Sequence, residues 1–306
     1  MNYKLCLPFI LFFIYPVSVH SAPIIENAQD NKTEIHYFQT DERYEYRIKL
    51  LELALSNTEG EWGPYKLIAD TRNITQGRGS LLLEQNKGID IASFPTSYER
   101  EKRFTPIRIP ILQGILGYRV LLIHKDNQKK FSNINSLEQL KTNHTAGFGE
   151  QWADLKILKS NQLPVSGIPQ YELLFAMLNK KRFDYFPRGI NEAWIEIEKY
   201  QYQYIGLMVE PSIALYYPFY VYFFVSKNNP ALAERIKMGL ESALKNGSFK
   251  MLYKKYHQPI ITKANLNNRK IFFLDNPYIP PIEKMPEVSW WLHSLKPTLP
   301  SVTTTY

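Results

Sequence analysis

The chain has 306 residues, of which 44% are hydrophobic and 22% are charged. This composition excludes a disordered or fibrous protein, and the length allows about two domains. The formal net charge is +8, but the basic residues are spread along the chain, whereas a tail that binds nucleic acid would cluster them. We therefore expect no nucleic-acid partner.

The N-terminus is typical of an export signal. Lys4 supplies a positive charge, residues 5–15 form an apolar run, and small residues occur within 18–22. The run is shorter than a helix that spans a bilayer. We expect residues 1–22 to be a cleaved signal peptide, which predicts a periplasmic mature protein. The alternative is a retained membrane anchor.

Signatures of catalysis are weak. The only cysteine in the sequence, Cys6, lies within the predicted signal, so the mature chain would have neither a disulfide nor a catalytic thiol. The histidines form no HExxH motif, and neither a GxSxG elbow nor a phosphate-binding P-loop occurs. We expect no enzyme activity, catalytic residue, metal site or cofactor. A hydrolase is an alternative that would require two carboxylates facing each other across a cleft.

Hydrophobic periodicity predicts alternating strands and helices along the chain. Strands are expected at 34–39, 65–69, 89–94, 118–124, 146–148, 183–186 and 221–225. Helices are expected around 44–55, 79–86, 136–140, 152–158, 171–179, 232–244 and 248–256. This alternation indicates a largely parallel sheet. From Ile260 onward, proline and polar residues predict an extended tail that packs around Trp290 and Trp291.

The segment 88–110, GIDIASFPTSYEREKRFTPIRIP, carries a distinctive pattern. It resembles the G-x-x-D strand, T-x-x-R and following aromatic of extracellular solute-binding protein family 3, the amino-acid-type periplasmic binding proteins of ABC importers. The matching residues are Gly88 (one residue out of register), Asp90, Thr96 or Ser97, Arg100 and Phe104. Three further segments resemble the family in the same order, at 137–149, 178–184 and 229–256. The resemblance covers roughly residues 34–258.

The resemblance implies an α/β, two-lobed periplasmic-binding-protein fold of type II. Two crossing strands, near 112–118 and 214–220, would join the lobes, and a ligand would bind in the crevice between them. The predicted divisions are lobe 1 at 23–114 and 218–259, lobe 2 at 115–217, and a C-terminal extension at 260–306.

The family also suggests which residues bind the ligand. Its arginine pairs with the ligand's carboxylate, because a guanidinium offers two parallel N–H groups to a planar acceptor. The resemblance assigns this role to Arg100, with hydroxyl donors from Thr96 and Ser97. The alternative for Arg100 is a surface ion pair with Glu99 or Glu101.

Other ligand contacts are expected around the entry to lobe 2. Gly149 is expected to open a helix, so that the N–H groups of Glu150 and Gln151 would hold an anion. The alternative is a plain turn between strand and helix. Tyr98 and Trp152 would stack on the ligand, with internal packing as the alternative for Trp152.

Three positions depart from the family pattern. The family has a hydroxyl residue five positions before the arginine, a threonine after the lobe-2 glycine, and an aspartate that holds the ligand's ammonium. This chain has Pro95, Glu150 and Gly189 at those positions. The departures predict an altered pocket.

A polar segment after a predicted strand end supplies candidates for that pocket. Arg188 would favour an anionic ligand, Glu192 would accept an amine, and Asn191 lies between them. The alternative is that these residues cap a helix and form a local ion pair.

The expected function is that of a periplasmic solute-binding protein. It would capture a small carboxylate-bearing polar solute, close around it, and present it to the permease of an ABC importer in the inner membrane. The alternative is a sensory or interaction module of the same fold that reports to a membrane receptor. We expect a monomer in either case.

Overall fold

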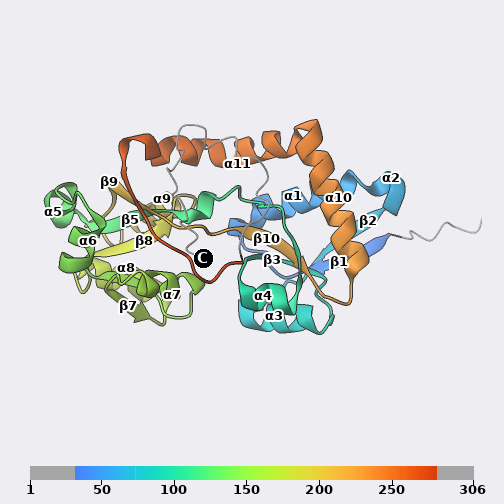
Figure 1. The fold of residues 1–306 in the computed structure, drawn as a ribbon, viewed down its shortest axis with the longest axis horizontal. Helices are drawn as coiled ribbons and strands as arrows, with labels where there is room; N and C mark the ends of the chain where they lie inside the picture. The colour runs from blue at the N-terminus through green and yellow to red at the C-terminus, as the bar shows by residue number, and fades with distance from the viewer. Residues whose placement is uncertain (1–31, 73, 281–306) are drawn as a thin grey trace, which may run out of the picture.

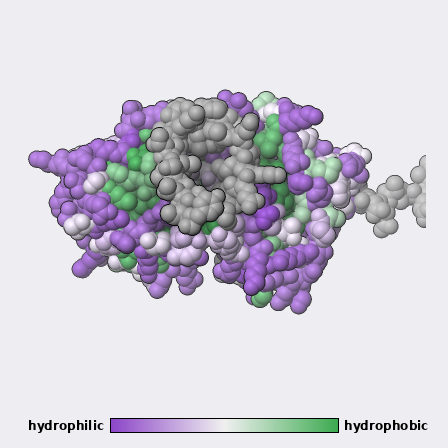
Figure 2. Space-filling view, in the orientation of Figure 1, coloured by the Kyte–Doolittle hydropathy of each residue, from purple (hydrophilic) through white to green (hydrophobic). Residues whose placement is uncertain are grey.

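Two units built from sheets and helices lie side by side along the long axis of the molecule (Figure 1). The computed structural model describes residues 32–72 and 74–280. The predicted signal peptide and the expected packing around Trp290 and Trp291 lie outside the described residues. Figure 2 shows the same face, on which hydrophilic residues cover the outer ends of both units.

Lobe 1 is built on two small sheets. In one, β1 (Thr33–Tyr37) runs parallel to β2 (Tyr65–Ala69). In the other, β10 (Val221–Val225) lies antiparallel between β3 (Ile91–Pro95) and β4 (Thr105–Ile107). The helical elements of this lobe are η1 (Glu42–Tyr44), α1 (Glu45–Ser56), α2 (Glu59–Trp62), α3 (Gln76–Glu84), α4 (Tyr98–Arg103) and α10 (Pro230–Asn246).

Lobe 2 is built on one six-stranded sheet in the order β11-β9-β5-β8-β6-β7. Its strands are β5 (Tyr118–His124), β6 (Ala146–Gly149), β7 (Val165–Ile168), β8 (Tyr185–Gly189), β9 (Leu207–Tyr216) and β11 (Lys270–Phe273). Its helical elements are η3 (Lys125–Asn127), α5 (Gln128–Ser132), α6 (Leu137–Asn143), α7 (Ala153–Ser160), α8 (Tyr171–Asn179) and α9 (Ala193–Tyr200).

The expectation of a largely parallel sheet is wrong. In lobe 2, β5 is antiparallel to both β8 and β9, while the outer pairs are parallel. The chain enters lobe 2 along β5 and leaves it along β9. Because these two strands are neighbours and run in opposite directions, the middle of the sheet has to be antiparallel.

Two crossing segments join the lobes, as the predicted fold requires. The first contains η2 (Ile115–Gly117) and leads into β5, and the second connects β9 to β10. They run side by side, since Tyr217 N donates to Gly117 O at 3.2 Å. A Cβ atom on Gly117 would lie only 2.5 Å from the carbonyl oxygen of Tyr217, so only glycine permits the two segments to approach this closely. The lobe boundaries at 114/115 and 217/218 stay predictions.

The expectation of an extended tail from Ile260 is also wrong for the described part of the chain. Helix α11 (Ser248–Ala264) continues through Pro259, followed by η4 (Leu266–Asn268) and strand β11, which pairs parallel with β9 in lobe 2. The helix continues because Ala264 is buried and Ile260 and Ile261 pack against the core. In Figure 1, α11 extends from α10 across to lobe 2.

The helices above lobe 1 are tied to the first crossing segment. The hydroxyl of Tyr46 in α1 donates to Ile111 O at 2.9 Å, and the hydroxyl of Tyr253 in α11 donates to Leu112 O at 3.4 Å. His257 of α11 lies against both tyrosines, with ring centroids 4.4 Å from Tyr46 and 4.6 Å from Tyr253. Burial and, to a smaller extent, the nearby Arg47 guanidinium together lower the pKa of His257 to about 4.

The buried imidazole predicts a pH-dependent stability. Between pH 6.5 and pH 4 the unfolded chain takes up a proton at this position while the folded chain resists it. The free energy of unfolding is therefore highest above pH 6.5 and should fall by about 3 kcal/mol as the pH drops to 4. His257→Phe keeps an aromatic ring there and should lose this part of the pH dependence. Urea unfolding at several pH values measures the difference; identical slopes would contradict the assignment.

Candidate ligand site between the lobes

A buried ion pair lies where lobe 2 meets the second crossing segment. Arg119 of β5 and Asp154 of α7 are 4% and 6% exposed, and their charged atoms are 2.5 Å apart. Tyr217 of the crossing segment donates from its hydroxyl to Asp154 Oδ2 at 2.6 Å and accepts from Arg119 Nε at 2.8 Å. The three side chains thus tie a strand, a helix and a crossing segment together.

A second arginine continues this network. Arg188 of β8 is 4% exposed and donates to Glu196 of α9 through Nε at 2.7 Å and Nη2 at 2.5 Å. Glu192 lies between the two arginines, 3.1 Å from Arg188 and 3.6 Å from Arg119. Burial would raise the pKa of Glu192, but Arg188 and Arg119 outweigh it and hold the pKa below its usual value.

Three polar groups of lobe 2 converge on Gly189, at the end of β8. A methyl group placed on this glycine would lie 2.7 Å from Asn191 Oδ1, 3.0 Å from Glu192 Oε2 and 3.1 Å from Arg119 Nη1. Asn191 Oδ1 is buried and has no hydrogen-bond partner within the described part of the chain. This cradle therefore presents two oxygen acceptors, one of them unsatisfied.

Lobe 1 contributes two guanidiniums from the region of β3. Arg100 of α4 is half-buried, donates from Nη1 to Pro95 O at 2.7 Å, and lies 5.4 Å from the centre of the Phe94 ring. Arg47 of α1 is also half-buried and donates from Nη1 to Ser93 Oγ at 3.1 Å. Neither forms an ion pair with a carboxylate among residues 32–72 and 74–280.

Arg47 retains an unused donor. Its Nε is buried and finds no hydrogen-bond partner among the residues that the structure describes. Burial lowers the pKa of Arg47, whereas Tyr44 and Glu192 act in the opposite direction. A guanidinium stays charged despite such a shift, so Arg47 brings a positive charge to this region.

Electrostatic interactions connect the two lobes. Glu192 of lobe 2 raises the pKa of Arg47, and Asp154 of lobe 2 raises the pKa of Arg100. For both arginines burial is the larger influence, and it lowers the pKa. The carboxylates that Arg119 and Arg188 hold in lobe 2 are thus near enough to the lobe-1 guanidiniums to act on their pKa. A small molecule with both an anionic and a cationic group would find complementary partners on the two sides.

The residues predicted around Arg100 have local partners. Thr96 is 5% exposed and its hydroxyl donates to Glu101 Oε1 at 2.6 Å, while Ser97 caps α4 by accepting from Arg100 N at 3.2 Å. Tyr98 is 54% exposed. The alternative ion pair of Arg100 with Glu99 or Glu101 does not form.

The expectation that Gly149 opens a helix is wrong. Helix α7 begins at Ala153, and the N–H of Glu150 donates to Ile168 O at 3.0 Å, so that it is not free to hold an anion. Parallel strands β6 and β7 continue their pairing to this point, and the pairing uses the donor. The Trp152 ring packs edge-on to Phe148 at 5.1 Å and lies 4.8 Å from the Arg188 guanidinium.

The predicted residues of the altered pocket are brought together only in part. Arg188 and Glu192 form the local ion pair that was their alternative, and Arg188 also pairs with Glu196. Asn191 and Glu192 both reach the cradle at Gly189, which Arg188 does not line. The sequence patterns missed Arg47, Arg119 and Asp154. A lone arginine in the apolar strand YRVLLIH is a signal that would have identified Arg119, because a buried charge needs a partner.

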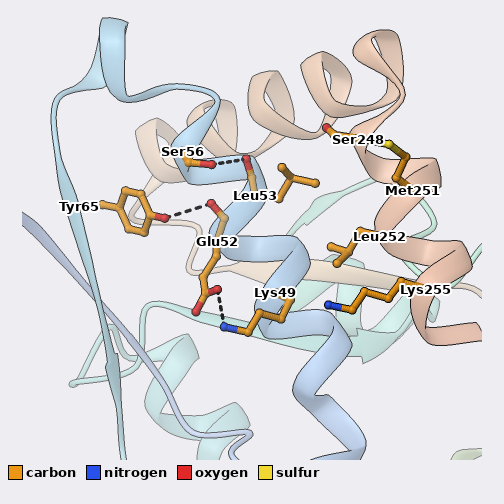
Figure 3. Close-up of a pocket in the computed structure, with 9 residues that line it drawn as sticks. All are labelled: Lys49, Glu52, Leu53, Ser56, Tyr65, Ser248, Met251, Leu252 and Lys255. Atoms are coloured by element: carbon orange, nitrogen blue, oxygen red, sulfur yellow. Dashed lines mark hydrogen bonds and ion pairs between the residues drawn. The ribbon is translucent and has the colours of Figure 1, made fainter.

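The described residues also contain a groove outside this region. It lies in lobe 1 between α1, β2 and α11 and has a volume of about 430 Å³ (Figure 3). Lys49 and Glu52 on its wall pair with each other at 2.9 Å, and Tyr65 donates to Glu52 O at 3.1 Å. In 32–72 and 74–280 there is no cluster of side chains fit to bind a metal and no helix of the length and apolarity that a membrane span needs.

The fold is that of two-lobed periplasmic binding proteins. An ancestral arginine-binding protein bound to arginine is similar at a TM-score of 0.51 and 20% identity, over 74% of this chain and 97% of that one. A probable extracellular-binding protein of an amino-acid ABC transporter from Bacillus subtilis is similar at 0.52 and 18% identity, over 74% and 96%. At such identities the likeness concerns the fold. The sequence matches no protein-family model and no curated protein.

Removal of the Asp154 carboxylate should destabilise the protein strongly. Asp154→Ala leaves the buried Arg119 guanidinium without its main counter-charge and Tyr217 without its acceptor, which typically costs about 3–5 kcal/mol. Asp126→Ala breaks an exposed ion pair with Lys181 and serves as the control, with little expected change. Equal stabilities in chemical unfolding would show that the buried pair does not hold the lobe together.

Proposed function

We propose that this chain is an exported solute-binding protein that captures a small, carboxylate-bearing polar solute of amino-acid type between its lobes and delivers it to an ABC importer. The observation that carries the proposal is the pair of half-buried lobe-1 guanidiniums, Arg47 and Arg100, without carboxylate partners in the described part of the chain. The similar structures support the ligand class, since one is an arginine-binding protein and the other an amino-acid transporter component.

The anionic end of the solute would bind lobe 1. Arg100 is its main anchor, because the hydrogen bond to Pro95 O uses one of the five N–H donors that a guanidinium carries. Arg47 is a second anchor, because its Nε–H has no hydrogen-bond partner among the described residues and would donate to the ligand's carboxylate. Thr96 would shape the site through α4 rather than by donating to the ligand, because its hydroxyl already donates to Glu101 Oε1. The Ser97 hydroxyl accepts from Arg100 N and retains its O–H donor for the ligand's carboxylate.

The cationic end would bind lobe 2. Gly189 stands where the family resemblance places an ammonium-holding aspartate, and Glu192 Oε2 lies 3.0 Å from the position of a side chain there. Glu192 would thus replace that aspartate from three residues further along the chain. Asn191 Oδ1, 2.7 Å from the same position, would accept a second hydrogen bond from the ammonium.

A ligand bound at both ends would bridge the lobes and favour the closed arrangement. No bond would form or break. Export through the predicted signal peptide of residues 1–22 would place this capture in the periplasm, where a membrane permease receives the solute.

The first test is the loss of binding on removing Arg100. A thermal-shift screen of free amino acids and organic acids identifies a ligand, because binding to the native state raises the melting temperature. Arg100→Ala should then weaken binding by about 2–5 kcal/mol in titration calorimetry, since the ligand's carboxylate loses a buried charged partner. Lys102→Ala, an exposed change on the same helix, is the control. An unchanged affinity for Arg100→Ala would refute its role.

The second test separates the two ends of the solute. Glu192→Gln should weaken binding of an amino acid by about 1–3 kcal/mol, because the ammonium loses a charged acceptor. The same substitution should leave the affinity for the corresponding acid without an amino group nearly unchanged. Equal losses for both compounds would mean that Glu192 acts by supporting the fold, and no binding of either would refute the ligand class.

A further inference from the structure

A segment that follows β11 runs from lobe 2 back to lobe 1 at the edge of the candidate site. We call residues 274–280 the interlobe strap. In Figure 1 it is the red segment that leaves lobe 2 and reaches the region of α4. The crossing-strand fold predicted from the sequence does not include this connection.

The strap is anchored in lobe 2 and on the second crossing segment. Leu274 N donates to Tyr216 O at 2.8 Å, and its side chain is 4% exposed. Asn161, which ends α7, exchanges two hydrogen bonds with the backbone of Asp275, at 2.7 and 2.9 Å. Asn276 donates to Pro218 O at 2.8 Å.

One residue of the strap touches both lobes. The carbonyl of Tyr278 accepts from Tyr98 N, at the start of α4, at 3.1 Å. Its ring lies 4.3 Å from Lys156 Nζ of α7, and its hydroxyl donates to Lys156 O at 3.5 Å. Ile279 then packs against a lobe-1 cluster that includes Phe94. Moving α4 away from α7 therefore breaks contacts on one side of Tyr278.

These two helices carry the candidate site. Tyr98 precedes Arg100 by two residues on α4, and Lys156 follows Asp154 by two residues on α7. We propose that the interlobe strap is a latch that holds the lobes together beside the site and that has to loosen before they open. Its effect on ligand exchange rests on the proposed function, whereas its effect on opening does not.

The test measures the distance between the lobes directly. Spin labels are attached at Arg78→Cys on α3 and Lys159→Cys on α7, both exposed positions, in the full chain carrying Cys6→Ser. Double electron–electron resonance measures the distance between the two labels in the absence of ligand. When Tyr278→Ala and Ile279→Ala are combined, the distribution of this distance should broaden and extend to longer values. Asn161→Ala, which leaves the strap sequence intact, should shift the distribution in the same direction. Tyr202→Ala, an exposed residue outside the strap, should not.

Ligand exchange gives a second, separable readout. The ligand is an amino acid found by the thermal-shift screen. The Tyr278→Ala/Ile279→Ala double variant and Asn161→Ala should each release this amino acid about tenfold faster than the parent in stopped-flow measurements, the effect expected from losing one or two modest contacts. If the double variant and Asn161→Ala both gave the same distance distribution as the parent, the proposal that the strap is a latch would be wrong. If no amino acid binds the parent protein, the proposed function fails, while the distance measurement still decides whether the strap restrains the lobes.

Discussion

The ion pair between Arg119 and Asp154 is the interaction on which the region between the lobes depends. A buried guanidinium near the start of an apolar strand is tolerated only with a counter-charge and hydrogen bonds, and Asp154 and Tyr217 supply both. Because Tyr217 belongs to the crossing segment, the same contact fixes the second lobe relative to the connection that leaves it. Glu192 extends the network to Arg188, and the cradle around Gly189 follows from where these groups lie.

The two lobes use charge differently. In lobe 2, Arg119 and Arg188 are buried among acidic partners, so that their charges are largely compensated. In lobe 1, Arg47 and Arg100 are held by a serine hydroxyl and a backbone carbonyl, which fix their positions without neutralising them. In the proposed function, this asymmetry would give a small zwitterion one preferred orientation, with its carboxylate toward lobe 1 and its ammonium toward lobe 2. It is the physical basis of the proposed ligand class.

The connections between the lobes set how they can move. Besides the two crossing segments, α11 leads into lobe 2, where Arg269 beyond its end donates to Ile213 O at 3.2 Å, and residues 274–280 return to lobe 1. Hinge closure in a two-lobed protein requires only a few residues to change conformation. Each additional contact that spans the lobes raises the free energy of opening. A strap beside the site would therefore slow both the binding and the release of the solute.

The sequence by itself determined the two-lobed fold and much of its local structure. Long apolar strands and amphipathic helices such as 232–244 were predictable because their burial pattern repeats with the period of the element, and the segment around Arg100 indicated the family fold. Only the tertiary structure decided which charged residues meet. Arg47, Arg119, Asp154 and Glu192 are far apart in the chain, and no periodicity relates them. Strand β11 and the return of the chain at 274–280 were likewise settled by pairing with the edge of β9 and by contacts with both lobes, which such short segments do not encode locally.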